Sequence, residues 1–471
     1  MYAFAVSATL ALSFLMIGVF ATEQSAERVS RPIEIQGVAP YGVWTILRVL
    51  SLVLLVLTIL TGLFGTQNPF NNFSLTFFWI GFALGLAYLT ALVGDFYAFI
   101  NPWLLLCDMI ERLRLMAFKR RVMYPAWLAY YPALVLYMGF IWLELFGQTT
   151  PRSVGFILVG YTILNFAAAA LFGADAWFKY GEFFAVFFRL LGKIAPLAYV
   201  QSPPPNSKIT VRLRRPFIGL IEETADHPSI LLFVLFMLSS TAFDGVHETL
   251  PWVQVFWRYF YPILTWAIDR PYSFFVGLYY HWQWAMLWLS PFIYFAIYLF
   301  FIWLTPGGDL RLRDRSLFFG YSLVPIAFVY NLSHYFTLLF TDAPRLVPLI
   351  FDPFGAGWDL FGTAQFLHQP MNPPPARFVW HIQVGLILLG HVVSVYLAHL
   401  QALRIFPKGR KALLSQFPML ALMIALTSVG LWILSLPIGA GQVLDPIPTS
   451  SVSSPARTAG PVQSFISNKA G

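Results

Sequence analysis

Imidazole and carboxylate side chains occur inside stretches that are otherwise apolar enough to cross a bilayer. The segment WHIQVGLILLGHVVSVYLAHL, residues 380–400, carries His381, His391 and His399. A charged group at the centre of a bilayer costs about 2.5–3.5 kcal/mol on insertion scales, so such groups are rare unless they pair, line water or bind a ligand. These residues are therefore candidates for chemistry.

The depth of each polar residue in the membrane follows from its position in its predicted span, at about 1.5 Å of rise per residue. Polar residues from several spans then fall at a similar depth. Asp244 and His247 share a helix face because they are three residues apart. Carboxylate and neutral imidazole are the ordinary ligands of zinc and similar divalent metals. The sequence predicts a metal site in the outer leaflet with Asp244, His334, His391 and His247 as ligands, and Glu144 and Asp244 as catalytic carboxylates.

The remaining polar groups divide by depth. Asp95, Asn101, Glu182 and His399 fall toward the inner face, where we expect a structural or proton-relay role. Asp95 and Asn101 flank a helix end followed by a proline, where capping is an ordinary function. His281 and His381 fall at outer span ends, where we expect interfacial hydrogen bonding.

Composition indicates a membrane protein. The chain of 471 residues is 58% hydrophobic and 11% charged, whereas a soluble domain has about 25% charged residues. The net charge of +8 does not indicate a nucleic-acid partner, because basic residues collect in the cytoplasmic loops of membrane proteins. The single cysteine, Cys107, excludes an internal disulfide and a cysteine-based metal site.

The apolar runs predict an all-α bundle of about ten transmembrane helices in one domain, residues 1–440, followed by a disordered periplasmic tail, 441–471. The expected spans are 2–21, 43–66, 75–97, 125–146, 154–172, 229–248, 281–304, 316–341, 378–400 and 417–440. Segments 98–124, 173–228, 305–315 and 401–416 hold 19 of the 29 Lys and Arg residues, which predicts that these segments are cytoplasmic and both termini are outside.

Three segments need separate interpretation. Residues 2–21 resemble a signal peptide but lack a basic start, and we expect a retained span. Residues 177–191 are rich in aromatic side chains, with Lys179, Glu182 and Arg189 between them, which predicts a helix along the cytoplasmic interface. Residues 251–272 are aromatic and bounded by prolines, and either an outer interfacial helix or a re-entrant cap is expected.

The chain resembles the fenitrothion hydrolases, a family of multi-spanning bacterial membrane proteins. The resemblance extends from about residue 75 to about residue 405 and covers Asp95, Asn101, Glu144, Glu182, Asp244, His334, His391 and His399. It is weaker at His247, His281 and His381. The segments that carry it are GDFYAFINPW (94–103), YPALVLYMGFIWLELF (131–146), FGADAWFKYGEFFAVFFRLLGKIAP (172–196), TAFDG (241–245), LSHYFTLLF (332–340) and GHVVSVYLAH (390–399).

The resemblance implies a hydrolase of organophosphate triesters in the bacterial inner membrane, in a hetero- or homo-oligomer with a related membrane subunit. Combined with the metal prediction, it suggests that a metal-activated water attacks a hydrophobic substrate that partitions into lipid. Two alternatives remain open from the residues: a transporter or proton-relay component, and a redox subunit with haem between two imidazoles, although no covalent haem-attachment motif is present.

The predicted orientation is testable with reporter fusions. A reporter fused after Gln416 should be cytoplasmic, because Arg404, Lys408, Arg410 and Lys411 surround this connection. A reporter fused after Ser451 should be periplasmic. If both fusions report the same side, the tenth span and the depth ranking are incorrect.

Overall fold

The structure is a computed structural model that describes residues 36–38, 41–118, 121–201, 209–305, 310–359, 361–363, 374–405 and 417–436. The described chain is mostly helical. The expected first span at 2–21 and the tail after residue 440 lie outside the described residues.

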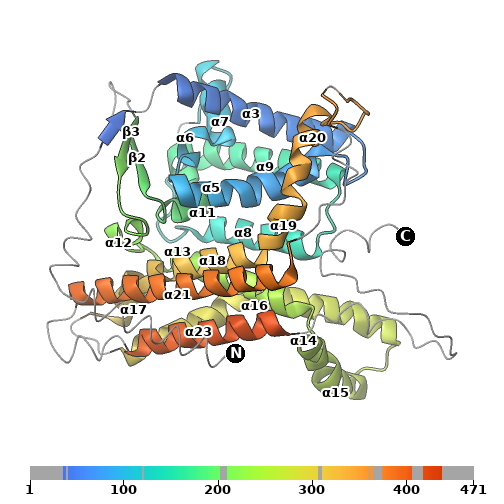
Figure 1. Cartoon of the computed structure of the whole chain (residues 1–471), viewed down its shortest axis with the longest axis vertical. Coiled ribbons are helices and arrows are strands. Elements are labelled where there is room, and N and C mark those ends of the chain that lie inside the picture. The colour runs from blue at the N-terminus through green and yellow to red at the C-terminus, as the bar shows by residue number, and fades with distance from the viewer. Residues whose placement is uncertain are drawn as a thin grey trace.

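The main helices run roughly parallel in two groups (Figure 1). One group contains α3 (Tyr41–Phe64), α4 (Phe73–Thr76), η1 (Phe77–Gly85), α5 (Leu86–Val93), α8 (Tyr131–Phe146), α9 (Pro151–Phe172) and α11 (Phe183–Gly192). The other contains α13 (Pro228–His247), α16 (Tyr272–Leu304), α17 (Leu312–Phe319), η4 (Gly320–Leu323), α18 (Val324–His334), α21 (Ala376–Ile405) and α23 (Phe417–Ser435). α13 contacts both α8 and α18 and so joins the groups.

Short elements lie at the two ends of the bundle (Figure 1). At the end predicted to be cytoplasmic are α6 (Tyr97–Ile100), α7 (Pro102–Arg112), α10 (Ala174–Ala176), η2 (Trp177–Gly181) and α12 (Gly219–Glu222). At the outer end are α14 (Leu250–Gln254), η3 (Val255–Phe260), α15 (Tyr261–Ala267), α19 (Phe336–Thr341), η5 (Ala343–Arg345) and α20 (Leu346–Phe351).

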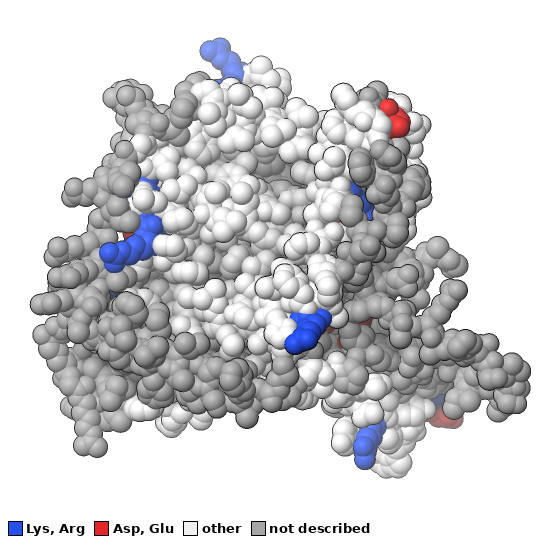
Figure 2. All heavy atoms as spheres, in the orientation of Figure 1, with Lys and Arg blue, Asp and Glu red and all other residues white. Residues whose placement is uncertain are grey.

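Seven helical segments are long and apolar enough to cross a membrane, so the chain is a multi-pass membrane protein. They are Gly42–Phe64, Phe73–Val93, Pro151–Phe172, Pro228–His247, Tyr272–Leu304, Leu312–His334 and Ala376–Arg404. Figure 2 shows a broad uncharged area across the middle of one face, with charged side chains nearer its margins, as a lipid-facing surface requires.

Every predicted span within the described residues falls on helix, but several boundaries differ. α8 begins at Tyr131 rather than 125 because Pro132 occupies its first turn. α16 begins at Tyr272 rather than 281, directly after Pro271, and continues for 33 residues. At 1.5 Å per residue α16 is about 50 Å long, well beyond the 30 Å hydrocarbon layer.

A small antiparallel sheet at the inner end was not predicted by the all-α assignment. Its strand order is β1 (Gln36–Val38), β3 (Ile209–Leu213), β2 (Leu197–Gln201), with Val211 facing Gly37 on one side and Tyr199 on the other. The strands are too short for their alternation to stand out from the surrounding apolar sequence.

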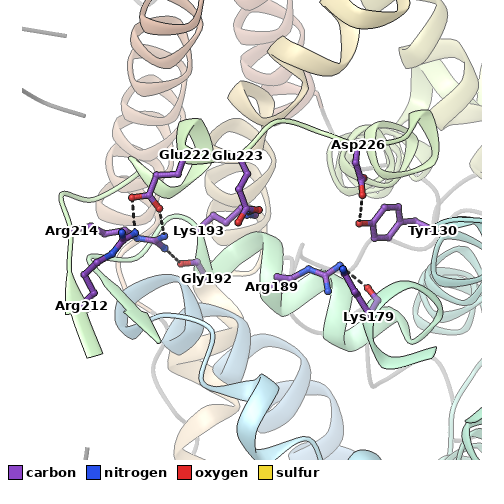
Figure 3. Close-up of polar contacts among 10 residues, drawn as sticks. All are labelled: Tyr130, Lys179, Arg189, Gly192, Lys193, Arg212, Arg214, Glu222, Glu223 and Asp226. Atoms are coloured by element: carbon purple, nitrogen blue, oxygen red, sulfur yellow. Dashed lines mark hydrogen bonds and ion pairs between the residues drawn. The ribbon is translucent and has the colours of Figure 1, made fainter. Parts of the chain in front are cut away.

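Hydrogen bonds and ion pairs of charged side chains connect this sheet to the bundle (Figure 3). Arg214 follows β3 and donates to the carbonyl oxygens of Gly192 at 2.6 Å and Ala195 at 2.9 Å. Glu222 accepts from Arg212 at 2.8 Å and from Arg214 at 3.3 Å, and Lys193 pairs with Glu223. The end of α11 is therefore tied to the sheet and to α12.

The predicted interfacial helix at 177–191 is wrong. The chain forms η2, turns at Glu182, and continues as α11, whose side chains are mostly enclosed by protein. α11 packs against α5, α6 and α8 and also contacts α18. Phe183, Phe184 and Phe188 are buried, whereas a helix lying along the interface would expose one face to lipid.

The aromatic segment at 251–272 forms a lobe beside the outer end of α16 (Figure 1). Its side chains are largely exposed: Tyr259 and Ile263 are examples, and Trp266 reaches 89%. This exposure agrees with the expected interfacial helix rather than with a re-entrant cap, whose side chains would be enclosed.

The contact between α11 and the loop after α5 requires a glycine at position 192. A Cβ added to Gly192 would lie 2.6 Å from both the backbone nitrogen and the Cβ of Asp95. Gly192→Ala should therefore destabilise the fold by about 1–3 kcal/mol, as expected for overpacking, and lower the apparent Tm in detergent. Gly160→Ala is the control, because a Cβ there meets nothing within 4 Å. Equal Tm values for the two variants would contradict this packing.

Candidate functional site at the outer end of the bundle

Asp244 is the centre of a polar cluster near the outer end of α13. Its Oδ2 lies 2.7 Å from Nε2 of His334, and the hydroxyl of Tyr335 donates to the same oxygen at 3.1 Å. The side chain of Asp244 is 10% exposed, whereas that of His334 is 30% exposed. The carboxylate is therefore enclosed while the imidazole remains accessible.

Glu144 brings a second carboxyl group to this cluster from α8. It lies close enough to Asp244, His334 and Tyr335 to interact with them electrostatically. His247 lies beside them, with Nδ1 2.9 Å from the backbone oxygen of Asp244 and 3.9 Å from its Oδ1. The outer cluster therefore consists of Glu144, Asp244, His247, His334 and Tyr335, from α8, α13 and the end of α18.

The end of α18 explains how two consecutive side chains reach one carboxylate. His334 is the last residue of α18, and Tyr335 leaves helical geometry with ψ of 8° before α19 begins. The amide of Tyr335 still donates to the carbonyl of Asn331 at 3.0 Å, so the turn is closed. The Asn331 side chain in turn accepts from the hydroxyl of Tyr88 at 3.1 Å, which ties α18 to α5.

The structure brings together four of the predicted site residues, Glu144, Asp244, His247 and His334, but does not join His391 to them. His391 is fully buried on α21, and its Nδ1 lies 2.7 Å from the carbonyl of Ile387. Its Nε2 has no hydrogen-bond partner among the described residues. No ion pair or hydrogen bond between described residues connects it to Asp244 or His334, the partners expected for it.

The donor set does not form a complete metal site in the part of the chain that is described. No group of three or more His, Cys, Asp or Glu side chains there is arranged to hold one ion. The 2.7 Å between His334 Nε2 and Asp244 Oδ2 is a direct hydrogen-bond distance. The metal therefore stays a prediction.

The other histidines follow their predicted depths. His281 and His381 are exposed, and the Nδ1 of each contacts the carbonyl four residues earlier in its own helix. His399 is buried near the inner end of α21. These positions agree with interfacial roles for the first two, and the role of His399 stays a prediction.

The inner group forms a second polar cluster, centred on Glu182. Glu182 is fully buried and is the N-cap of α11, accepting from the amides of Phe184 at 3.0 Å and Ala185 at 2.7 Å. Asn101 donates to it at 3.1 Å, and so does the hydroxyl of Tyr161, near the middle of α9. The sequence had placed Glu182 at the interface, but it lies inside the bundle.

Asn101 and Asp95 have the capping positions expected from the sequence. Asn101 is the N-cap of α7 and accepts from the amides of Trp103 and Leu104. Asp95 accepts from the amide of Ala98 at 3.3 Å, at the start of α6. Burial raises the pKa of Asp95 to about 6, although Arg189 and Lys193 act in the opposite direction.

Two tyrosines of these clusters were missed from the sequence, Tyr161 and Tyr335. The chain has 22 tyrosines, and most are expected in packing and interface positions. The only available signal was that Tyr335 directly follows His334. Comparison of the chain with protein-family models, curated proteins and solved structures gives no match.

The inner cluster should stabilise the fold without taking part in chemistry. Glu182→Ala removes the acceptor of four buried donors, each of which costs about 1–3 kcal/mol when left unsatisfied. We expect a large loss of folded protein, measured by size-exclusion chromatography after heating, with unchanged activity per folded molecule. Glu111→Ala is the control, since Glu111 is an exposed carboxylate on α7. Normal stability with lost activity in the Glu182 variant would favour the proton-relay alternative.

Proposed function

We propose that the chain is a membrane-embedded hydrolase of apolar esters, with its active site at the outer cluster. The observation that carries this proposal is the 2.7 Å contact between the enclosed carboxylate of Asp244 and the accessible imidazole of His334. A carboxylate that holds an imidazole in one tautomer is the usual support for a general base.

The geometry defines the direction of proton transfer. Nε2 of His334 faces Asp244 and donates its proton there, which leaves the Nδ1 lone pair as the basic atom. No hydrogen bond within the described residues occupies Nδ1. A water molecule beside Nδ1 loses a proton to His334 as its oxygen attacks the ester, and Asp244 stabilises the imidazolium that forms.

The surroundings suit a substrate that enters from the lipid. Phe146 and Phe243 pack against His247, and Trp252 packs against Phe243. These rings form an apolar wall next to the polar cluster. Together with the resemblance to fenitrothion hydrolases, they support an organophosphate triester as the substrate class, in the bacterial inner membrane and in an oligomer with a related subunit.

The alternatives have less support from the described residues. A through-membrane relay or transporter needs Asp95, Asn101 and Glu182 as exchangeable polar groups, but their side chains are used as helix caps. A haem subunit predicts a Soret band in the optical spectrum of the purified protein, and its absence would remove that alternative.

Substitution of the dyad should abolish hydrolysis without unfolding the protein. We expect His334→Gln and Asp244→Asn to lower kcat for an organophosphate triester by about 10²–10⁴-fold, the usual contribution of a general base. His281→Gln should have wild-type kcat, because His281 is an exposed outer histidine whose ring contacts the carbonyl of Gly277 in its own helix. Activity is measured on protein of equal monodispersity in lipid nanodiscs. Wild-type activity in both dyad variants would refute the proposal.

Chelation distinguishes the dyad acting alone from the metal site predicted by the sequence. If the dyad acts alone, activity should survive EDTA. His391→Ala should then also have a normal kcat. The metal site predicts that EDTA, His391→Ala and His334→Ala each remove bound zinc or a similar ion and activity together. Metal content by mass spectrometry and kcat are measured on the same samples.

A further inference from the structure

A small cavity lies inside the bundle, where α5, α8, α11, α13 and α18 meet. The space that it leaves for the centre of a water molecule is about 10 Å³. One buried water needs about 10–15 Å³ of such space, so the cavity has room for a single water and not for an organic ligand.

Three polar side chains line the cavity, those of Tyr88, Tyr137 and Asn331. The hydroxyl of Tyr88 donates to Oδ1 of Asn331 at 3.1 Å, so the oxygen of this amide is engaged and its NH₂ group is left as a donor. No hydrogen bond within the described residues uses that NH₂ group. The oxygens of the two tyrosines add acceptors, so the cavity offers at least two partners to a water molecule.

The lining decides between a dry cavity and a water site. Cavities lined only by apolar groups stay dry, whereas buried polar groups that lack protein partners are satisfied by water, usually through two to four hydrogen bonds. An amide NH₂ group without an acceptor is costly in an apolar interior, and a water that accepts from it removes that cost. The amide of Asn331 therefore favours a hydrated cavity.

We propose that this cavity is a binding site for one water molecule, held by the amide of Asn331 and the hydroxyls of Tyr88 and Tyr137. The site adjoins the outer cluster: Asn331 lies three residues before His334 in α18, roughly one helical turn. Glu144 is also close enough to both tyrosines to interact with them electrostatically. The water site does not depend on the reaction proposed for the outer cluster.

Radiolytic footprinting of the protein in lipid nanodiscs tests the site, because hydroxyl radicals formed from a bound water oxidise the side chains beside it. Met237 and Tyr137 line the cavity and are buried, so bulk solvent should not label them. We expect oxidation of both above background. Met423 and Tyr298 are the matched controls, because they are also buried but do not line this cavity, and they should stay at background.

A double variant removes most of the polar lining. Tyr88→Phe combined with Asn331→Leu deletes both members of one hydrogen bond and keeps similar shapes, which costs less stability than leaving one member unsatisfied. Only Tyr137 then remains as a polar partner, fewer than the two that a bound water needs. We expect this variant to fold, with oxidation of Met237 and Tyr137 reduced to background.

Two results would overturn the water site. Background oxidation of Met237 and Tyr137 in the wild-type protein would mean that the cavity is dry. Oxidation that persists in the double variant would mean that radicals reach these side chains from bulk solvent. If the double variant does not fold, the wild-type comparison with Met423 and Tyr298 still decides whether the cavity is hydrated. The hydrolase proposal is tested separately, by the kinetics of His334→Gln.

Discussion

The fully buried carboxylate of Glu182 is the interaction on which the arrangement of the helices depends. A carboxyl group inside a membrane bundle is costly unless donors surround it, and Glu182 has four: two amides of α11, the amide of Asn101 and the hydroxyl of Tyr161. These donors fix the start of α11 against α7 and α9. α11 then packs against α8, which carries Glu144, and contacts α18, which carries His334. The inner cluster thus sets the spacing of the helices that build the outer cluster.

The two clusters contain similar residue types but differ in hydrogen-bond balance. Both carboxylate oxygens of Glu182 accept hydrogen bonds from donors that the fold holds in place. Neither is left to bind a substrate, so the residue acts as a structural link. In the outer cluster the carboxylate of Asp244 is bound by His334 and Tyr335, and the imidazole of His334 is 30% exposed. Among the described residues no hydrogen bond occupies Nδ1 of His334, so this cluster has fewer fixed hydrogen bonds than the inner one. This imbalance, rather than the residue types, distinguishes a site for chemistry from a site for stability.

The apolar runs and the depth of polar residues predicted much of this structure. They predicted the long described helices, though not the short ones at the ends of the bundle, and placed Glu144, Asp244, His247 and His334 in one zone, because helical rise converts sequence position into depth. The direction in which each helix face points within the bundle is not encoded so directly. The sequence therefore did not show that His391, on α21, lies apart from these residues. The segment at 177–191 has the composition of an interfacial helix, but its burial depends on contacts with distant helices, which local pattern does not report. The sheet depends on pairing between strands far apart in the sequence, and Tyr335 is one of many tyrosines.

The tautomer of His334 tests this account most directly, because the proposed general base needs its proton on Nε2, toward Asp244, and a free lone pair on Nδ1. Nitrogen-15 NMR of histidine-labelled protein, with His334→Gln to assign the signal, identifies which ring nitrogen of His334 carries the proton. The account predicts that His334 carries its proton on Nε2 in the wild-type protein and in the control Glu248→Gln, and that this preference is lost in Asp244→Asn. A wild-type spectrum in which neutral His334 carries its proton on Nδ1 would contradict it.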